Sequence, residues 1–185
     1  DKTGLLLIIA PHPDDESFAC GGLIAQHIAA GGRVHIAVVT DGSASSPTSA
    51  ILPEELIALR RQETIDAFKI LGGNEGDVSF LNYRDGHIEH EAEKLHHDLQ
   101  RQVAELSPNY IAAPIPFDGN IDHQTIGHAA SMIETSATVL LYPLWFWPRQ
   151  AACSLRKLFQ YKVQKLNVRY EMEVKSAAIH AHRSQ

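Results

Sequence analysis

The chain has 185 residues, of which 44% are hydrophobic and 21% are charged, and its formal net charge is −6 at pH 7. This composition is typical of a soluble globular protein, and the length suits one domain with a sizeable core, so we expect a single domain over residues 1–185. The acidic balance argues against nucleic acid as a main partner, because phosphate binding needs a basic face. No apolar run approaches the roughly 20 residues that span a bilayer and no signal peptide is visible, so we expect no integral membrane segment.

The two cysteines, Cys20 and Cys153, are too few for a disulfide framework. Free buried thiols are typical of a reducing cytosol, so we predict a cytoplasmic protein. The chain begins with Asp1 and not with Met, which leaves open that it is one domain of a longer protein. We also keep a homo-oligomer open for so compact a chain, although no sequence feature marks an interface.

Strand and helix patterns alternate along the first 135 residues. The apolar run Leu5–Ala10 predicts a strand buried on both faces, and residues 17–30 follow it with apolar side chains near helical spacing. The other predicted strands in this part cover 34–40, 78–81 and 110–113, and the other predicted helices cover 54–71, 91–106 and 124–135. Such alternation implies βαβ units with right-handed crossovers, and therefore an α/β protein with a parallel sheet.

The pattern is less regular beyond residue 135. We expect a strand at 139–142 and a second short one at 144–147. Residues 162–170 alternate in polarity, which predicts a further strand, and 171–182 look helical.

Polar residues follow the first predicted strand in the sequence Pro11-His12-Pro13-Asp14-Asp15-Glu16-Ser17. In open α/β sheets, ligands bind at the carboxyl ends of the strands. His12 and Asp15 are three residues apart across a turn, which lets both face one ion, and a catalytic zinc ion takes three such ligands and keeps one position open for water. If Asp15 binds a metal, the side chain of Asp14 diverges from it and is free to accept a proton from the activated water. The alternative is that Asp14, Asp15 and Ser17 only cap the following helix.

A third ligand is expected from another turn at the same edge of the sheet. The turn after the strand at 110–113 reads Pro116-Phe117-Asp118-Gly119-Asn120-Ile121-Asp122-His123 and opens a helix. His123 could therefore complete a His-Asp-His set with His12 and Asp15.

The sequence resembles a known family at three places. These are His12-Pro13-Asp14-Asp15-Glu16, the Asp122-His123 pair that opens a helix, and His182-Arg183-Ser184-Gln185 at the end of the sequence. They resemble the PIG-L/LmbE-like metal-dependent deacetylases, which include N-acetylglucosaminyl-phosphatidylinositol de-N-acetylases and the deacetylases of mycothiol and bacillithiol synthesis. The resemblance implies a Rossmann-like three-layer fold with a mostly parallel sheet and helices on both faces.

The resemblance also implies roles for single residues. It implies one zinc ion, with Fe2+ as the alternative, held by His12, Asp15 and His123, and it makes Asp14 the general base. The implied substrate is a small-molecule amino-sugar conjugate.

Further residues match the family less specifically. Arg60 matches an arginine that holds the sugar, although Arg61 could take that place. Asp85 falls in a substrate-facing loop of the family, but an Asp-Gly turn needs no function. The resemblance further implies that His182 packs near the site.

One departure from the family pattern concerns Asn120. The family commonly has His-x-x-His in the second motif, and its first His stabilises the oxyanion or passes a proton. Asn120 can donate one hydrogen bond to an oxyanion but cannot act as an acid, so Asp14 would move the proton both ways or His128 would reach in from the helix.

The predicted function is zinc-dependent hydrolysis of the N-acetyl group of an amino sugar by metal-activated water. One alternative is hydrolysis of another amide, on an antibiotic, lipid or thiol conjugate. The other is a metal-binding or carbohydrate-binding module without turnover, which the Asn120 departure suggests.

Overall fold

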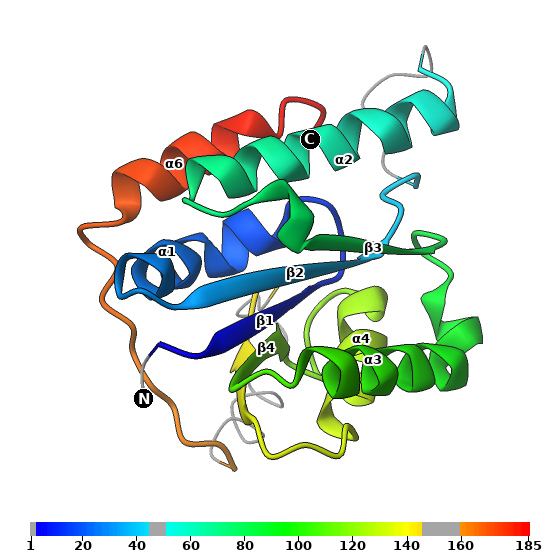
Figure 1. The fold of residues 1–185 in the computed structure, drawn as a ribbon. Helices are drawn as coiled ribbons and strands as arrows, with labels where there is room; N and C mark the ends of the chain where they lie inside the picture. The colour runs from blue at the N-terminus through cyan, green and yellow to red at the C-terminus, as the bar shows by residue number, and fades with distance from the viewer. Residues whose placement is uncertain (1–2, 45–50, 146–159) are drawn as a thin grey trace.

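The computed structural model describes residues 3–44, 51–145 and 160–185, and these form a twisted sheet flanked by helices (Figure 1). Within these ranges, five strands make one sheet in the order β3-β2-β1-β4-β5, and all neighbouring pairs are parallel. The strands are β1 (Leu5–Ala10), β2 (Arg33–Thr40), β3 (Val78–Tyr83), β4 (Tyr110–Pro114) and β5 (Thr138–Tyr142).

Helices cover both faces of this sheet, so the predicted three-layer α/β fold is confirmed. The α-helices are α1 (Asp15–Ala29), α2 (Pro53–Ile70), α3 (Ala92–Leu106), α4 (Ile121–Ser131) and α6 (Met172–Ala181), and the short 3-10 helices are η1 (Glu75–Asp77) and η2 (Ile88–Glu91). Figure 1 shows α1, α2 and α6 on one face and α3 and α4 on the other.

The central strand β1 is buried on both faces, as its continuous apolar sequence predicts. Leu7 and Ile9 belong to the core beneath α3 and α4, whereas Leu6 and Ile8 belong to the core beneath α1, α2 and α6. All four side chains are at most 1% exposed. Burying an aliphatic side chain of this size contributes about 1.5–3 kcal/mol relative to exposure, so β1 anchors both layers.

The strand order places a topological switch beside β1. The chain runs from β1 to β2 and β3 on one side, and then returns to place β4 on the other side of β1. The turns that follow β1 and β4 therefore meet at the carboxyl edge of the sheet, which is where open α/β sheets bind their ligands.

The predicted strand at Lys162–Tyr170 is wrong. The structure shows no strand at 162–170, and these residues are mostly exposed, with Val163 at 74% and Leu166 at 46%. The segment instead runs past α1, where the Gln26 side chain donates to the Asn167 carbonyl (3.2 Å). Alternating polarity favours an extended backbone, but a strand also needs a neighbouring strand edge, and none of the described residues offers one here.

Smaller differences concern residues near helix and strand ends. Leu144 and Trp145 form a bend in place of the expected strand, and residues 146–147 lie outside the described residues. Helix α4 begins at Ile121, three residues earlier than predicted, because the side chain of Asn120 caps it.

The described cysteine is a buried structural thiol. Cys20 on α1 is free and 2% exposed, and burial raises the pKa of its thiol far above the ordinary value, which makes it unreactive. Cys153 lies outside the described residues. Among the helices that the structure describes, none has the length and apolar character needed to cross a bilayer.

Candidate metal centre

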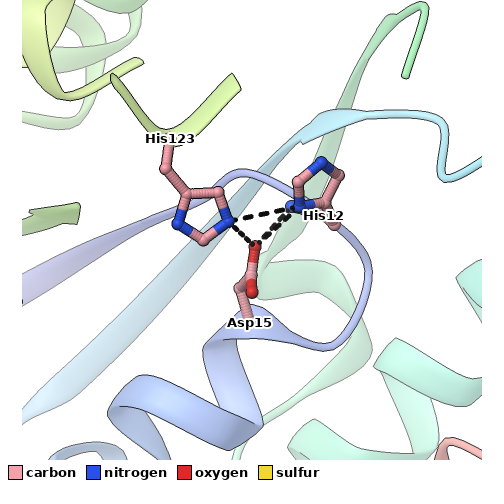
Figure 2. Close-up of side chains that lie close together, drawn as sticks. All are labelled: His12, Asp15 and His123. Carbon is pink, nitrogen blue, oxygen red and sulfur yellow. Dashed lines mark hydrogen bonds and ion pairs between the residues drawn. The ribbon is translucent and has the colours of Figure 1, made fainter. Parts of the chain in front are cut away.

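The three predicted ligands meet at the carboxyl edge of the sheet. Figure 2 shows His12 on the β1–α1 turn, Asp15 at the start of α1 and His123 on α4, all pointing toward one another. The Oδ2 atom of Asp15 lies 3.1 Å from His12 Nδ1 and 3.1 Å from His123 Nε2. The two ring nitrogens are 3.3 Å apart. One carboxylate oxygen and two imidazole nitrogens thus form a nearly equilateral triangle.

This triangle fits a tetrahedral metal ion. Zinc binds histidine nitrogen and carboxylate oxygen at about 2.0–2.2 Å, so two ligand atoms on one tetrahedral ion are about 3.3 Å apart. The three distances in the structure match that separation. Hydrogen bonds alone explain the triangle less well, because both rings face the same oxygen and also face each other. The arrangement could hold a metal ion with one position left open.

The β1–α1 turn aims its side chains by its own hydrogen bonds. The Asp14 and Asp15 amides both donate to the His12 carbonyl (2.9 and 3.3 Å), which makes the turn tight. The His12 amide in return donates to Asp15 Oδ2 (2.9 Å). Asp14 occupies the N-cap position of α1, yet its side chain makes no capping hydrogen bond. The alternative that these aspartates only cap the helix is therefore wrong.

The β4–α4 turn positions His123 by helix capping and by close packing. Asn120 Oδ1 accepts hydrogen bonds from the Asp122 and His123 amides (2.8 and 3.3 Å) and so fixes the first turn of α4. Gly127, one turn further on, lets α4 lie directly on β4, since a Cβ there would come within 2.6 Å of the Pro114 carbonyl oxygen. His123 is fully buried as a result.

Carboxylates lie behind both imidazoles. His12 Nε2 is 3.2 Å from Asp122 Oδ2 and 3.4 Å from Asp85 Oδ1, and His123 Nδ1 is 3.7 Å from Asp118 Oδ1. Metal-bound histidines usually donate their far N–H to such a group, which fixes the tautomer and the ring orientation. His12, Asp85 and Asp122 also form a second acidic cluster, but it shares His12 with the triangle and matches this supporting arrangement.

Asp118 is held rigidly in this supporting position. Its two oxygens accept hydrogen bonds from the Leu144 and Trp145 amides (3.0–3.2 Å), and one also accepts from the Asn120 amide (3.3 Å). The carboxylate is 2% exposed. The bend after β5 is thereby tied to the turn that carries His123.

Charge around the site separates the two neighbouring aspartates. Burial and the like charges of Asp15 and Glu16 raise the pKa of Asp14 to about 7. Burial would also raise the pKa of Asp15, but hydrogen bonds with His12 and His123 outweigh it and hold this pKa well below its ordinary value. Asp15 is therefore a stable anion beside the two imidazoles, while Asp14 lies near the point at which it can take up and release a proton.

The carboxylates near His12 raise the pKa of its imidazole, whereas the two imidazoles lower the pKa of Asp15. Burial would lower the pKa of His12, but hydrogen bonds to Asp122, Asp15 and Asp85 raise it well above the ordinary value.

Of the two neighbouring arginines on α2, Arg60 is the one that faces the site. It is 2% exposed, donates to the Gly42 carbonyl, and its charge acts on Asp14 and Asp85. Arg61 instead bonds the Asn82 side chain and lies over the Phe80 ring, 5.2 Å from its centroid.

Asp85 lies beside the same site. It is buried, contacts His12, and accepts a hydrogen bond from the Ala44 amide (3.1 Å). His128, by contrast, is exposed on α4, and within the described part of the chain it contacts none of the three ligands.

Two residues of the site were not anticipated from the sequence. Asp118 and Asp122 flank Asn120 in the turn already identified. They could have been found from the rule that a ligating histidine usually has a carboxylate at its far nitrogen. His182 was expected near the site, and it lies against Glu16, next to Asp15 (2.9 Å from Nε2 to Oε1).

Known proteins are similar to this chain in sequence and in fold. The family model described as PIG-L, GlcNAc-PI de-N-acetylase, matches residues 7–133. This range includes all three residues of the triangle. The protein named "Probable N-acetyl-alpha-D-glucosaminyl L-malate deacetylase 2" of Bacillus anthracis is 31% identical over 140 residues, 72% of this chain and 60% of that protein. Its namesake in Bacillus subtilis is 34% identical over 130 residues, 67% of this chain and 58% of that protein.

A solved structure agrees with these relatives. The N,N'-diacetylchitobiose deacetylase from Pyrococcus horikoshii superposes with a TM-score of 0.79 at 25% identity, covering 98% of this chain and 70% of that one. The chain spans about three fifths of the length of the two Bacillus relatives. Since the family model matches well over half of its residues, the chain belongs to the PIG-L, GlcNAc-PI de-N-acetylase family.

Proposed function

We propose that the protein is a zinc-dependent deacetylase that removes the N-acetyl group from an amino sugar. The observation that carries this proposal is the triangle of His12, Asp15 and His123, whose separations of 3.1–3.3 Å suit one tetrahedral ion. The reaction splits an amide with water, which gives acetate and a free amine.

The three triangle residues would hold the ion, with Fe2+ as the alternative to zinc. When bound, the metal supplies Lewis-acid polarisation of the acyl carbonyl and a water of lowered pKa. The carboxylates of Asp122, Asp85 and Asp118 would keep the two imidazoles in the orientation and tautomer that binding requires.

Asp14 would act as the general base. It lies beside Asp15 with a pKa raised to about 7, and none of the described residues donates a hydrogen bond to its carboxylate. A base with a pKa near the working pH combines the correct protonation state with a useful driving force. Asp14 would take a proton from the attacking water and return it to the leaving amine, since no histidine occupies position 120.

Asn120 would contribute to the oxyanion site through its amide nitrogen. Its Oδ1 is committed to the cap of α4, which leaves the Nδ2 group to donate toward a developing negative charge. The cap fixes the plane of the amide, so the direction of that donor is set before the substrate arrives.

Arg60 and Asp85 would bind the substrate next to the metal centre. Both are buried and they act on each other electrostatically. Asp85 contacts His12, and the charge of Arg60 acts on Asp14. Paired donors and acceptors of this kind suit sugar hydroxyl groups.

The substrate class rests on the relatives. The names of the two Bacillus proteins specify an N-acetylglucosaminyl malate, and that of the Pyrococcus protein a diacetylated chitobiose. We therefore infer an N-acetylglucosaminyl conjugate as the substrate, with another amide on an antibiotic, lipid or thiol conjugate as the second candidate.

The test couples elemental analysis of the purified protein to acetate release from a panel of N-acetylated sugars and simple amides. We expect about one metal ion per chain and acetate from N-acetylglucosaminyl compounds. Acetate from the simple amides alone would shift the substrate class. A metal-loaded protein that releases no acetate would favour the binding module, and a protein that takes up no metal would refute the proposal.

A further inference from the structure

The last described segment of the chain, residues 182–185, lies against the two elements that carry the candidate site. Figure 1 shows α6 beside α2 on the face covered by α1, and the segment follows α6 directly. His182 and Ser184 are buried, at 5% and 6% exposed, whereas Arg183 and Gln185 between and after them are exposed. We call these four residues the 182–185 segment.

The first contact of the 182–185 segment is with the start of α1. His182 Nε2 lies 2.9 Å from Glu16 Oε1 and 3.2 Å from Ser17 Oγ. The Ser17 hydroxyl also donates to Glu16 Oε1 (2.7 Å). All three side chains are buried, and Glu16 directly follows the ligand Asp15.

Two further contacts complete the segment. Ser184 donates its amide and its hydroxyl to the two oxygens of Glu63 (3.0 and 2.6 Å), and Glu63 lies one turn after Arg60 on α2. Gln185 donates its side-chain amide to the Pro13 carbonyl (3.2 Å). The segment therefore joins the β1–α1 turn to the helix that carries Arg60.

The buried Glu16–His182 pair is not expected to add much to the stability of the fold. Replacing a buried ion pair by apolar residues is often neutral or stabilising, because the attraction barely offsets the loss of hydration. Here two atoms of the pair, Glu16 Oε2 and His182 Nδ1, are buried without a hydrogen-bond partner among the described residues. A pair retained at such a cost suggests a role in geometry.

The Asp14 side chain makes no hydrogen bond to the described residues, although its backbone bonds His12, Ser17 and Phe18. The carboxylate of Asp15 is held by His12 and His123, and it receives the His12 amide as well. The Asp14 carboxylate has no such partner within residues 3–44, 51–145 and 160–185. Its direction is set by the backbone on either side of it.

The 182–185 segment holds that backbone from both sides. Gln185 bonds Pro13, the residue before Asp14, and His182 bonds Glu16, two residues after it. We propose that the 182–185 segment is a positioning device for Asp14, with His182 as its main positioning residue, acting through Glu16. This inference rests on the proposed function only in so far as Asp14 is taken to be the base.

If the 182–185 segment positions Asp14, its loss should change two measurable quantities. These are the mobility of residues 12–17 and kcat. Loss of the His182 contact should loosen residues 12–17 without removing a metal ligand. Because a misdirected base slows the chemical step while ground-state contacts stay, we expect kcat to fall about 10–100-fold with KM within about twofold.

The experiment compares His182→Ala with the conservative His182→Gln, which keeps a side-chain N–H donor. His180→Ala serves as the matched control, because His180 is exposed on the same helix and bonds only the Ser176 carbonyl among the described residues. Gln185→Ala removes an exposed contact and therefore tests the device in a protein whose core is untouched.

Hydrogen exchange is measured first, because it needs no substrate. We expect exchange in 12–17 to accelerate at least about tenfold in His182→Ala, to return most of the way in His182→Gln, and to stay at the wild-type rate in His180→Ala. Gln185→Ala should show a smaller acceleration in the same turn. Faster exchange spread evenly over the sheet, or none in the turn of a folded variant, would overturn the proposal.

Kinetics are then measured on the metal-loaded variants. A fall in kcat with an unchanged KM, and a Glu16→Gln/His182→Ala double variant no slower than the worse single one, would show that both residues act as one unit. A change in KM alone would overturn the assignment. If the wild-type protein releases no acetate, the proposed function fails, while the exchange measurement still decides whether the segment positions the turn.

Discussion

The two turns that supply the candidate ligands are built in different ways. The β1–α1 turn places His12, Asp14 and Asp15 within four residues and is supported from outside by the 182–185 segment. The β4–α4 turn supplies one side chain to the triangle, His123, and is supported from within by the cap of Asn120.

The two turns therefore differ in what they contribute to the site. The first turn holds the only carboxylate of the triangle and the proposed base, so its geometry must be accurate to a fraction of an ångström. The second turn places one candidate ligand, His123, by helix capping and by close packing of α4 on β4. Loosening the first turn without removing His12 or Asp15 should therefore lower the rate through Asp14. Disturbing the packing of the second turn on β4 should lower metal binding and stability through His123.

The largest effect is expected for His123→Gln. Removing a ligand should weaken metal binding by more than about 100-fold, since changes to supporting groups alone cost 10–100-fold. Asp118→Asn is the comparison variant, because it leaves all three triangle residues in place. It changes the carboxylate 3.7 Å behind His123, which also accepts the Leu144 and Trp145 amides, and it should cost about 10–100-fold in metal affinity. Metal affinity measured by competition with a chelator distinguishes the two. Equal affinities would mean that His123 is not a ligand.

Asp14→Asn should next slow turnover strongly without removing the metal. General-base catalysis contributes about 10²–10⁴-fold, and Asn has the shape of Asp but cannot take a proton. Metal content should stay at the wild-type level while kcat falls by that factor. An active variant would mean that another group is the base.

Asn120→Asp separates the two proposed uses of that side chain. The variant keeps a capping oxygen but loses the NH2 donor, so the melting temperature should be retained while kcat falls on the order of 10²-fold. Asn120→Ala should lose both, with about 1 kcal/mol less stability. If Asn120→Asp is as active as the wild type, Asn120 serves the fold alone.

Gly127→Ala tests how closely α4 must lie on β4. The new methyl group would come within 2.6 Å of the Pro114 carbonyl oxygen, and overpacking of this kind costs about 1–3 kcal/mol. We expect a lower free energy of unfolding and weaker metal binding, because His123 moves with the helix. Gly76→Ala is the control, since nothing lies within 4 Å of a Cβ there. Similar denaturation midpoints for both variants would contradict the close packing.

The smallest effect is the pH dependence of the Glu16–His182 pair. Burial would lower the pKa of His182, but the hydrogen bond and charge of Glu16 outweigh it, so the pKa is raised. A raised pKa in the folded state means that this contribution is fully present below the unfolded-state value of about 6.5 and is lost as the pH rises through the folded-state value.

Urea denaturation of the wild type and His182→Gln measures this dependence. The difference in their free energies of unfolding should be largest below the unfolded-state value of about 6.5, and it should shrink as the pH rises through the raised folded-state pKa. His180→Gln should show a difference that does not vary in this way. A difference that grows with pH would mean that the Glu16 contact does not favour the protonated imidazole.

The sequence allowed the parallel sheet and both ligand turns to be predicted, because their signals are local. Leu5–Ala10 is a continuous apolar run, and His12, Asp15 and His123 lie in the turns that follow predicted strands. Parallel topology then brings the ends of neighbouring strands together, so the triangle follows from order along the chain.

Other features depend on contacts that no local pattern contains. The exposed extended residues 162–170 have the alternation of a strand but no strand beside them. The hydrogen bonds from Ser184 to Glu63 and from the Leu144 amide to Asp118 join residues far apart in the sequence. Only the folded arrangement shows which of many polar residues meet.

The triangle lies across the boundary between β1 and β4, so a bound ion would also affect how firmly these two strands are held together. β1 is in register with β2 over six positions but with β4 over only three, Leu6–Ile8 against Tyr110–Ala112. His12 and Asp15 belong to one side of this boundary and His123 to the other, so an ion held between them cross-links the two halves of the sheet. By mass action, a metal present at about 1,000 times its dissociation constant adds about 4 kcal/mol to the folded state. Chelation should therefore lower the stability of the sheet as well as stop the proposed hydrolysis.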